Sequence, residues 1–380
     1  LMLAQNQMGD LSFLAGSTGI VTLDLSNNLI VDGEDGSVSP TDSLSAMKAL
    51  NLSGNQLTDI SFLEGCANLE ELNISYINHN SDAAFHLVVP PGLSSLTTLI
   101  SRGNRIATLS LPVDLAQLTA LDLSSSTAPE FELVSAPDGL TALNLSNNRL
   151  TSLTLPVDSP IQTLNLPNNQ LSDYGFLEEL QSLRELNMGA NGLTQFELLP
   201  EFKGLEVLNL VSNQLTSFEI PAEFSELREL DFSRNKLTSF SLPDGLEKLR
   251  SLDLSNNLLP RVELPDGLYA LEELTLSYNK LTSLTLPAGL SNLSSFAVLG
   301  NQLASLVLPN GLDNLVSLNA RGNALTSLPM PGGLGRLAIL DLSSNALAAL
   351  ELPAGMVSLS EIRLAGNSIT SLSLPGDLEA

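Results

Sequence analysis

The chain has 380 residues and a formal net charge of −26 at pH 7, from 16 basic and 42 acidic side chains. Because nucleic acids and anionic membrane surfaces are bound by basic protein surfaces, this charge argues against both as partners. A single cysteine excludes an internal disulfide framework, and the absence of an apolar run of about 18 residues predicts that no segment inserts in a membrane.

A short motif, LxLxxN, starts at the first residues and recurs to the end of the chain. Its final asparagine marks seventeen units, and from Asn169 to Asn367 every step is 22 residues. Such self-similarity predicts a single solenoid over residues 1–380, in which each unit is a coil stacked on its neighbours. The asparagines expected to form a structural ladder through the stack are Asn148, Asn169, Asn191, Asn213, Asn235, Asn257, Asn279, Asn301, Asn323, Asn345 and Asn367.

Two early units are longer than the rest and carry small loop insertions at about residues 29–48 and 77–91. Because both insertions start at the same point of the coil, two coils apart, we expect them to project side by side from one edge. The second insertion holds the two histidines of the chain, His79 and His86, with Asp82 between them. Loop histidines are more often solvated than bound to a metal.

A typical unit is LEELTLSYNKLTSLTLPAGLSN, residues 271–292. Its first half alternates apolar and polar residues, which predicts a short strand whose leucines point inward. The asparagine then turns the chain, and its amide can bond to backbone groups of neighbouring coils. The second half also alternates, which predicts an extended segment on the other side of the coil, closed by a Pro-x-Gly turn. Residues 57–72 and 171–186 lack that proline, and we expect helical or 3-10 segments there.

The repeated pattern LxxLxLxxNxLxxLxL resembles that of the leucine-rich repeat superfamily, and LTDISFL (residues 57–63) is similar to coils of internalin-type bacterial surface proteins. The resemblance covers nearly the whole chain. It implies an α/β-type, mostly β solenoid of about 17 coils of 22 residues, with a concave parallel sheet and short extended or 3-10 segments on the convex side. It also implies a binding surface rather than catalysis, so we expect no enzymatic activity.

The chain starts inside the motif and stops on a repeat boundary, at LPGDLEA. We therefore expect that a leader has been lost before residue 1 and that more polypeptide follows residue 380. The end coils have no polar caps and expose apolar edges, which favours a homodimer through the ends of the solenoid or a flanking domain.

One polar position recurs between the two inward leucines of the motif, as Asp or Asn in twelve of seventeen units. Because side chains alternate along a strand, this residue points outward, onto the concave face. Successive strands lie roughly 4.8 Å apart, so these side chains form an oxygen-rich stripe. The ligand-binding residues predicted from the stripe and from one neighbouring aromatic are Asp122, Asn144, Asn165, Asn187, Asn209, Asp231, Asp253 and Tyr278.

Three interpretations of this stripe stay open. In the first, the side chains only hydrogen-bond to their neighbours in the coils above and below. In the second, they form a groove for a neutral, hydroxyl-rich polymer. In the third, calcium, which takes about six to eight oxygen ligands, binds at the adjacent carboxylates of Asp231 and Asp253. Arg234, in the same unit, would neutralise that pair without a metal.

Aromatic side chains, which usually stack on sugars, are few, at 4% of the chain. Tyr76 and Tyr278 lie just past a predicted strand and are the best candidates, while Tyr174 and Tyr269 lie on other faces. The chain has no Gly-rich phosphate loop and no nucleophile elbow, so the sequence offers no motif for catalysis.

The predicted function is a non-catalytic binding module, extracellular or at the surface of a bacterial cell. Its predicted ligand is a soluble plant-type polysaccharide (β-glucan, xyloglucan or mannan), with calcium as the predicted structural cofactor. The alternative is a protein-binding adhesin or interaction module of the internalin type. Protein-binding surfaces usually carry aromatic and charged hot spots, whereas this stripe is mostly Asn, Ser and Asp, which favours the polysaccharide.

Overall fold

The computed structural model describes residues 1–31, 44–77 and 85–377. The chain divides into two compact units, Leu1–Asn191 and Gly192–Ala380. Each unit is described by itself.

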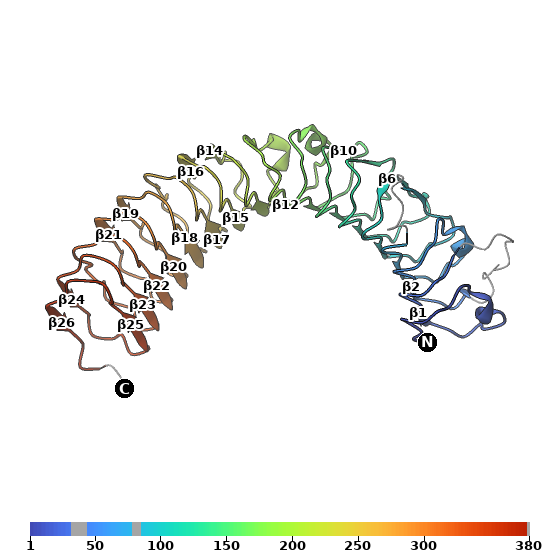
Figure 1. Ribbon diagram of the computed structural model, residues 1–380. Helices are drawn as coiled ribbons and strands as arrows, with labels where there is room; N and C mark the ends of the chain where they lie inside the picture. Colours follow the sequence, from blue (N-terminus) through green and yellow to red (C-terminus); the bar gives the residue numbers. More distant parts are fainter. Residues whose placement is uncertain (32–43, 78–84, 378–380) are drawn as a thin grey trace. The chain divides into compact units, whose positions relative to one another are not determined.

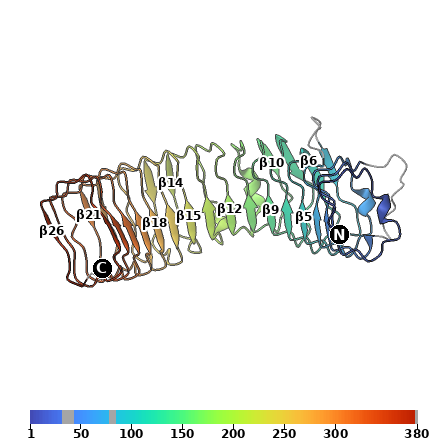
Figure 2. The ribbon, with the colours of Figure 1, turned by 60° about the horizontal axis from the view of Figure 1, so that its bottom comes forward.

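Each unit contains one main sheet of parallel strands, and each strand is three residues long. Figure 2 shows these strands side by side within each unit. The main-sheet strands of the first unit, in order, are β1 (Thr22–Asp24), β2 (Ala49–Asn51), β3 (Glu71–Asn73), β5 (Thr98–Ile100), β7 (Ala120–Asp122), β9 (Ala142–Asn144), β11 (Thr163–Asn165) and β12 (Glu185–Asn187). Those of the second unit are β13 (Val207–Asn209), β15 (Glu229–Asp231), β17 (Ser251–Asp253), β18 (Glu273–Thr275), β20 (Ser295–Ala297), β22 (Ser317–Asn319), β23 (Ile339–Asp341) and β25 (Glu361–Arg363).

The repeat sets the register of the main sheets. Leu230 pairs with Leu252, and Leu252 pairs with Leu274, one repeat apart at each step. These central apolar residues are buried, while the residues on either side of them are exposed or half-buried. The alternation follows from the pleat, because successive side chains of a strand point to opposite faces. The predicted solenoid with a parallel sheet is confirmed.

The opposite side of the coils carries further short strands, as predicted from the second alternating half of the repeat. In the first unit they form one sheet in the order β10 (Ser152–Thr154), β8 (Glu130–Leu133), β6 (Ile106–Ser110), β4 (Phe85–Val88). In the second unit they come in pairs, which Figure 1 shows on the side away from β15, β17 and β18. The pairs are β14 (Ser217–Glu219) with β16 (Ser239–Ser241), β19 (Ser283–Thr285) with β21 (Ser305–Val307), and β24 (Ala349–Glu351) with β26 (Ser371–Ser373).

Four of the described coils have no such strand and contain a short 3-10 helix. The two segments that lack the Pro-x-Gly turn each contain one, as expected from the sequence. The helices are η1 (Ser12–Leu14), η2 (Ser61–Leu63), η3 (Gly175–Glu179) and η4 (Pro200–Phe202).

The core of each unit is a stack of aliphatic side chains, mainly leucine, that point inward from both sides of the coils. In the second unit phenylalanines join this stack, and the ring centroids of Phe218 and Phe232 lie 4.5 Å apart. Cys66 is buried in the first unit, and burial raises the pKa of its thiol to about 11. Among the described residues, no helix has the length and apolar character needed to cross a membrane.

Candidate binding surface

The Asp and Asn side chains between the motif leucines form a row on the outer face of each main sheet, called here the Asx row. In the first unit the row includes Asp122, Asn144, Asn165 and Asn187, and in the second it includes Asn209, Asp231 and Asp253. All seven side chains are half-buried. Each follows a buried leucine, so the strand holds it with its polar end outward.

One oxygen of every side chain in the row except Asn165 is held by the backbone of its own coil. In the first unit, Oδ1 of Asp122, Asn144 and Asn187 accepts the backbone N–H two residues ahead, at 3.0 Å each. In the second unit, the same bond measures 3.0 Å at Asn209, 2.9 Å at Asp231 and 2.7 Å at Asp253. This is an Asx turn, in which a short side chain satisfies a donor at the end of its strand.

The Asx turn explains why both Asp and Asn occur in the row, because each supplies the same acceptor oxygen. Asn165 is the exception, since the residue two ahead is Pro167, which has no N–H to donate. These bonds lie within a coil, whereas the first interpretation from sequence placed them between coils. Apart from Asn165, the second oxygen or the amide nitrogen of each side chain takes no part in the Asx turn.

Asp122 makes an ion pair that the sequence analysis missed. The Arg102 guanidinium, from the preceding coil, approaches the Oδ2 atom of Asp122 with Nε at 2.8 Å and Nη2 at 2.6 Å. Burial raises the pKa of Asp122, but hydrogen bonds from Arg102 and Ser124 outweigh it, so this pKa lies below its ordinary value. Both oxygens of Asp122 are therefore engaged, so the surface carries an ion pair here rather than a free carboxylate.

Asp231 and Asp253 are paired one above the other in the register of β15 and β17. Burial raises the pKa of Asp253, the hydrogen bonds from Ser255 lower it, and the neighbouring Asp231 carboxylate raises it further, with a net increase. Arg234 does not relieve this repulsion, because its exposed side chain makes no ion pair with any described residue. The pair therefore carries a negative charge that no described cation neutralises.

Calcium at Asp231 and Asp253 stays a prediction. In the described part of the chain no group of three or more Asp, Glu, His or Cys side chains is arranged to hold a metal ion. The pair offers its two Oδ2 atoms, since Oδ1 of each residue is engaged by a backbone N–H. Melting curves in calcium and in EGTA, at matched ionic strength, test the prediction by whether calcium alone raises the Tm.

Replacing Asp122 or Asp253 with asparagine is expected to change stability in opposite directions at pH 7. The folded pKa of Asp122 is lowered, so its carboxylate stabilises the fold above the unfolded pKa of about 4, and this contribution disappears as the pH falls through the folded pKa. The folded pKa of Asp253 is raised, so stability is lost as the pH rises through it. Asp122→Asn should therefore lower the free energy of unfolding by about 0.2–1 kcal/mol, the range of exposed ion pairs, and Asp253→Asn should raise it.

Urea titrations at pH 7 and pH 3 measure both effects. Asparagine keeps the Oδ1 acceptor of the Asx turn, so each variant changes mainly the charge. The change in the free energy of unfolding that each substitution causes should be smaller at pH 3 than at pH 7. If both substitutions changed the free energy of unfolding in the same direction at pH 7, the prediction would be wrong. The stability contributed by Asp122 and Asp253 would then not depend on their charged neighbours, Arg102 and Asp231 respectively.

Two tyrosines lie at the end of main-sheet strands, one in each unit. Tyr76 and Tyr278 both have a positive φ, 57° and 55°, which is uncommon for a bulky residue. Each ring lies against a glycine of the next coil, and a Cβ placed on Gly300 would be 2.7 Å from Cδ1 of Tyr278. Gly103 stands in the same relation to Tyr76. The rings are 46% and 54% exposed, so each is supported on one side and open on another.

The motif asparagines are held in a different way from the Asx row. Asn257 donates from Nδ2 to the carbonyls of Leu254 in its own coil and Phe232 in the preceding coil, at 3.0 Å each. Its Oδ1 accepts the N–H of Leu237 at 3.0 Å. The ladder residues Asn148 to Asn301 are buried, and Asn323, Asn345 and Asn367 are half-buried. Their polar groups face the turns inside the stack rather than a ligand.

The remaining candidates lie apart from the Asx rows. His79 and Asp82 lie outside the described residues, together with residues 32–43 of the first insertion and 78–84 of the second. His86 is in β4, on the opposite side of the coil, with Nδ1 2.7 Å from Oγ1 of Thr108. Tyr269 follows the Pro-x-Gly turn at residues 265–267, with its ring against Gly289.

The comparisons with known families agree with the repeat pattern. Residues 210–319 match the BspA type leucine rich repeat region, six copies, and residues 46–86 match the leucine rich repeats, two copies. No curated protein matches the chain.

Among solved structures, the chain is similar to bacterial proteins of the same architecture. YopM from Yersinia enterocolitica is 29% identical, with a TM-score of 0.66 over 94% of this chain and 77% of YopM. A leucine-rich repeat protein of Leptospira interrogans is 26% identical, with a TM-score of 0.64 over 91% of this chain and 90% of that protein. The functional domain of InlJ from Listeria monocytogenes is 26% identical, with a TM-score of 0.61 over 73% of this chain and 60% of that domain.

Proposed function

We propose that this chain, which is a member of the leucine-rich repeat superfamily, is a non-catalytic module that binds a protein ligand on the outer faces of its main sheets. The similarity to YopM and to the functional domain of InlJ from Listeria supports a protein partner. This reverses the order of the two functions predicted from sequence, because the comparisons favour the alternative.

The Asx rows are the observation that carries the proposal. In each row, hydrogen bonds to the backbone fix the side chains at the spacing of the strands. A ligand therefore meets oriented amide and carboxylate groups whose conformational freedom is already reduced, which lowers the entropic cost of binding. Arg102 with Asp122 and the exposed rings of Tyr76 and Tyr278 add the charged and aromatic side chains that usually dominate protein interfaces.

A soluble polysaccharide is the second candidate ligand, and the tyrosines supply the reason. Tyr278 is 54% exposed, and its ring rests on Gly300 in the next coil, so it offers a fixed aromatic surface beside the Asx row. An aromatic surface next to amide oxygens and amide hydrogens suits a sugar ring with hydroxyl groups along its edge. β-Glucan, xyloglucan and mannan remain the polymers to test.

One set of variants distinguishes the two ligands. The chain, immobilised through its C-terminus, is exposed to extracellular protein preparations, and captured partners are identified by mass. Asn144→Arg and Asn187→Arg place a bulky cation on the sheet face and should abolish capture. Thr154→Arg, on the exposed opposite side, should leave capture unchanged.

The same variants are run in native gels that contain β-glucan, xyloglucan, mannan or no polymer. Equal capture by all three variants would contradict binding on the main sheet. Retardation by a polymer that Asn144→Arg removes, without capture of any protein, would establish the polysaccharide instead.

We also propose an extracellular or cell-surface location, as expected from the sequence and supported by the matches to bacterial leucine-rich repeat proteins. Homodimer formation through the end coils stays a prediction. Apolar side chains in the first and last coils are exposed, at 53% for Leu1, 70% for Met2 and 50% for Leu374.

A further inference from the structure

The outer face of the main sheet in the first unit is hollowed over its first strands. The hollow, called here the Ala49 pocket, has a volume of about 280 Å³ and lies over β1, β2, β3 and β5. Sites that enclose a whole small molecule usually measure about 300–1,000 Å³. The Ala49 pocket therefore has room for one long side chain rather than for a larger ligand.

Small and apolar side chains shape this pocket. Ala49 pairs with Thr22 on one side and with Glu71 on the other, and its methyl group leaves the middle of the face open. Two residues further along the strands, at the position of the Asx row, Met2 pairs with Asp24 and Ile100 pairs with Asn73. Met2 is 70% exposed and Ile100 is half-buried. The pocket is thus closed at both ends by apolar side chains that replace the Asp or Asn of other coils.

Two carboxylates in the lining are not neutralised. Asp24 is half-buried, and its Oδ1 accepts the Ser26 N–H at 2.9 Å, which leaves Oδ2 outside the Asx turn. Glu71 is exposed. No basic side chain lines the pocket, and neither carboxylate forms an ion pair with a described residue. Lys48, next to Ala49 in the chain, is 2.6 Å from Glu70, and neither of these two residues lines the pocket.

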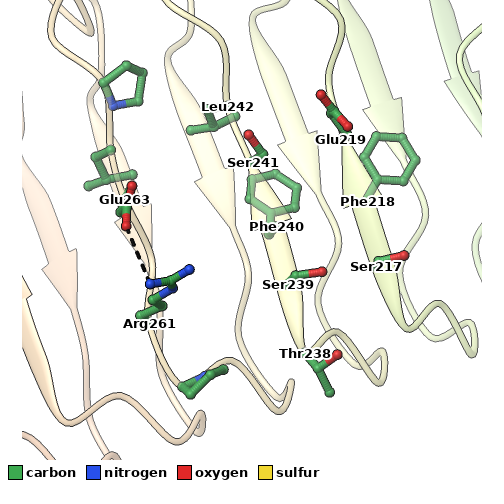
Figure 3. Close-up of a pocket in the computed structure, with 13 residues that line it drawn as sticks. Ser217, Phe218, Glu219, Thr238, Ser239, Phe240, Ser241, Leu242, Arg261 and Glu263 are labelled. Carbon is green, nitrogen blue, oxygen red and sulfur yellow. Dashed lines mark ion pairs between the residues drawn. The ribbon is translucent and has the colours of Figure 1, made fainter.

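The larger groove on the opposite side of the coils in the second unit differs in this respect. It has a volume of about 750 Å³, and both Glu219 and Glu263 line it. Figure 3 shows that Arg261 lies beside Glu263, and the two side chains are 4.0 Å apart. The chain itself therefore supplies a cation to that groove, whereas it supplies none to the lining of the Ala49 pocket.

A side chain with a long apolar stem and a terminal cation matches the pocket. Lysine and arginine both have this form, and they bury the stem while the charged end meets a carboxylate. Arginine fits better, because its guanidinium is less strongly hydrated than an ammonium and can donate two parallel hydrogen bonds to one carboxylate.

We propose that the Ala49 pocket binds an arginine side chain of the protein ligand. The stem of the arginine packs between Met2 and Ile100, over the methyl group of Ala49. Its guanidinium pairs with the half-buried Asp24, and the exposed Glu71 adds a second negative charge at the rim. The inference rests on the proposed function, since it assigns a basic segment of the ligand to one part of the main-sheet face.

NMR of the methyl groups of Met2 and Ile100, titrated with N-acetyl-arginine methylamide, tests the proposal. We expect saturable shifts of both methyl signals, with a Kd in the millimolar range. N-acetyl-citrulline methylamide has nearly the same shape but no charge, so it should bind at least threefold more weakly, as expected for the loss of an ion pair at a surface. Shifts that do not saturate below 100 mM, or equal Kd values for the two probes, would overturn the proposal.

Three variants locate the probe in the pocket. Asp24→Asn keeps the Oδ1 acceptor of the Asx turn and removes only the charge, so it should weaken arginine binding by about two- to fivefold. Ala49→Leu fills the hollow and should abolish the saturable shifts, and a melting curve shows whether it folds like the natural chain. Glu185→Gln is the control, because Glu185 stands on β12 at the position equivalent to Glu71 but outside the pocket. An unchanged Kd in Asp24→Asn would overturn the proposal, and so would weaker binding in Glu185→Gln equal to that in Asp24→Asn.

The small probe separates this inference from the proposed function, because it binds without the natural ligand. Arginine binding that Asp24→Asn weakens would support the pocket whether or not a protein is captured by the immobilised chain. Capture that Asn144→Arg abolishes, but that Ala49→Leu and Asp24→Asn leave unchanged, would overturn the pocket as a site for the ligand and leave the proposed function intact.

Discussion

Leu252→Ala is expected to lower the free energy of unfolding by about 2–5 kcal/mol, the range for removing a large side chain from a packed core. Leu252 is 1% exposed and lies between Leu230 and Leu274 in the register of the main sheet. The coil cannot close over the cavity, because neighbouring coils fix its position on both sides. Urea titration of the natural chain and the variant measures the loss.

Leu258→Ala is the control for this change. Leu258 is in the same coil but is 38% exposed, so its truncation should lower stability by less than about 1 kcal/mol. In a solenoid each coil is stabilised by its neighbours, so the loss at Leu252 should also speed hydrogen exchange in the adjacent coils first. A loss at Leu252 no greater than at Leu258 would mean that the motif leucines do not form the core.

The period of the repeat predicted the fold to the level of single strands. Given the 22-residue spacing and the alternation around Leu252, the position of β17 and its partners follows directly. The 3-10 helices at Ser61–Leu63 and Gly175–Glu179 also followed, from the missing proline in those coils. These features depend on residues within a single coil or recur in every coil, so the structure of one coil predicts that of the next.

Features that differ from coil to coil were not predicted. The ion pair of Arg102 with Asp122 joins residues 20 apart, on a diagonal between adjacent coils that the 22-residue spacing does not itself mark. The pairing of β14 with β16 does not continue into the next coil, where residues 260–264 form no strand. Pro260 stands there in place of the threonine of the two preceding coils. The sequence shows this proline but not which strand lies beside it. Both features arise because adjacent coils carry different residues at equivalent positions, which the repeat itself does not predict.

At the candidate site, the sequence predicted where the side chains of the Asx row lie but not the hydrogen bonds that they make. The sequence placed Asn144 and Asp231 on the outer face of the sheet, and the structure has them there. The acceptor role of Oδ1 depends on the backbone turning after the strand so that the N–H two residues ahead points back. Pro167 after Asn165 is the one sequence signal that reports on this bond, because it marks the coil in which the bond is impossible.

Asn257→Ala is expected to lower the free energy of unfolding by about 1–3 kcal/mol. Asn257 is 5% exposed, and its truncation leaves the buried Leu237 N–H without its partner. The carbonyls of Phe232 and Leu254 each lose one bond but keep a second amide donor, from Asn235 and Asn279 respectively. A buried backbone group without a partner costs about 1–3 kcal/mol, so the Leu237 N–H dominates the expected loss.

Asn144→Ala is the matched control for Asn257→Ala, since the same atoms are removed from the main-sheet face. Asn144 is half-buried and makes one bond, to the Ser146 N–H, which water can replace after truncation. Its loss should lower stability by no more than about 1 kcal/mol. Urea titrations of both variants measure the difference. Equal losses would contradict the division between a structural ladder inside the coils and a row of polar side chains available to a ligand, because that division requires the outer asparagine to contribute little to folding.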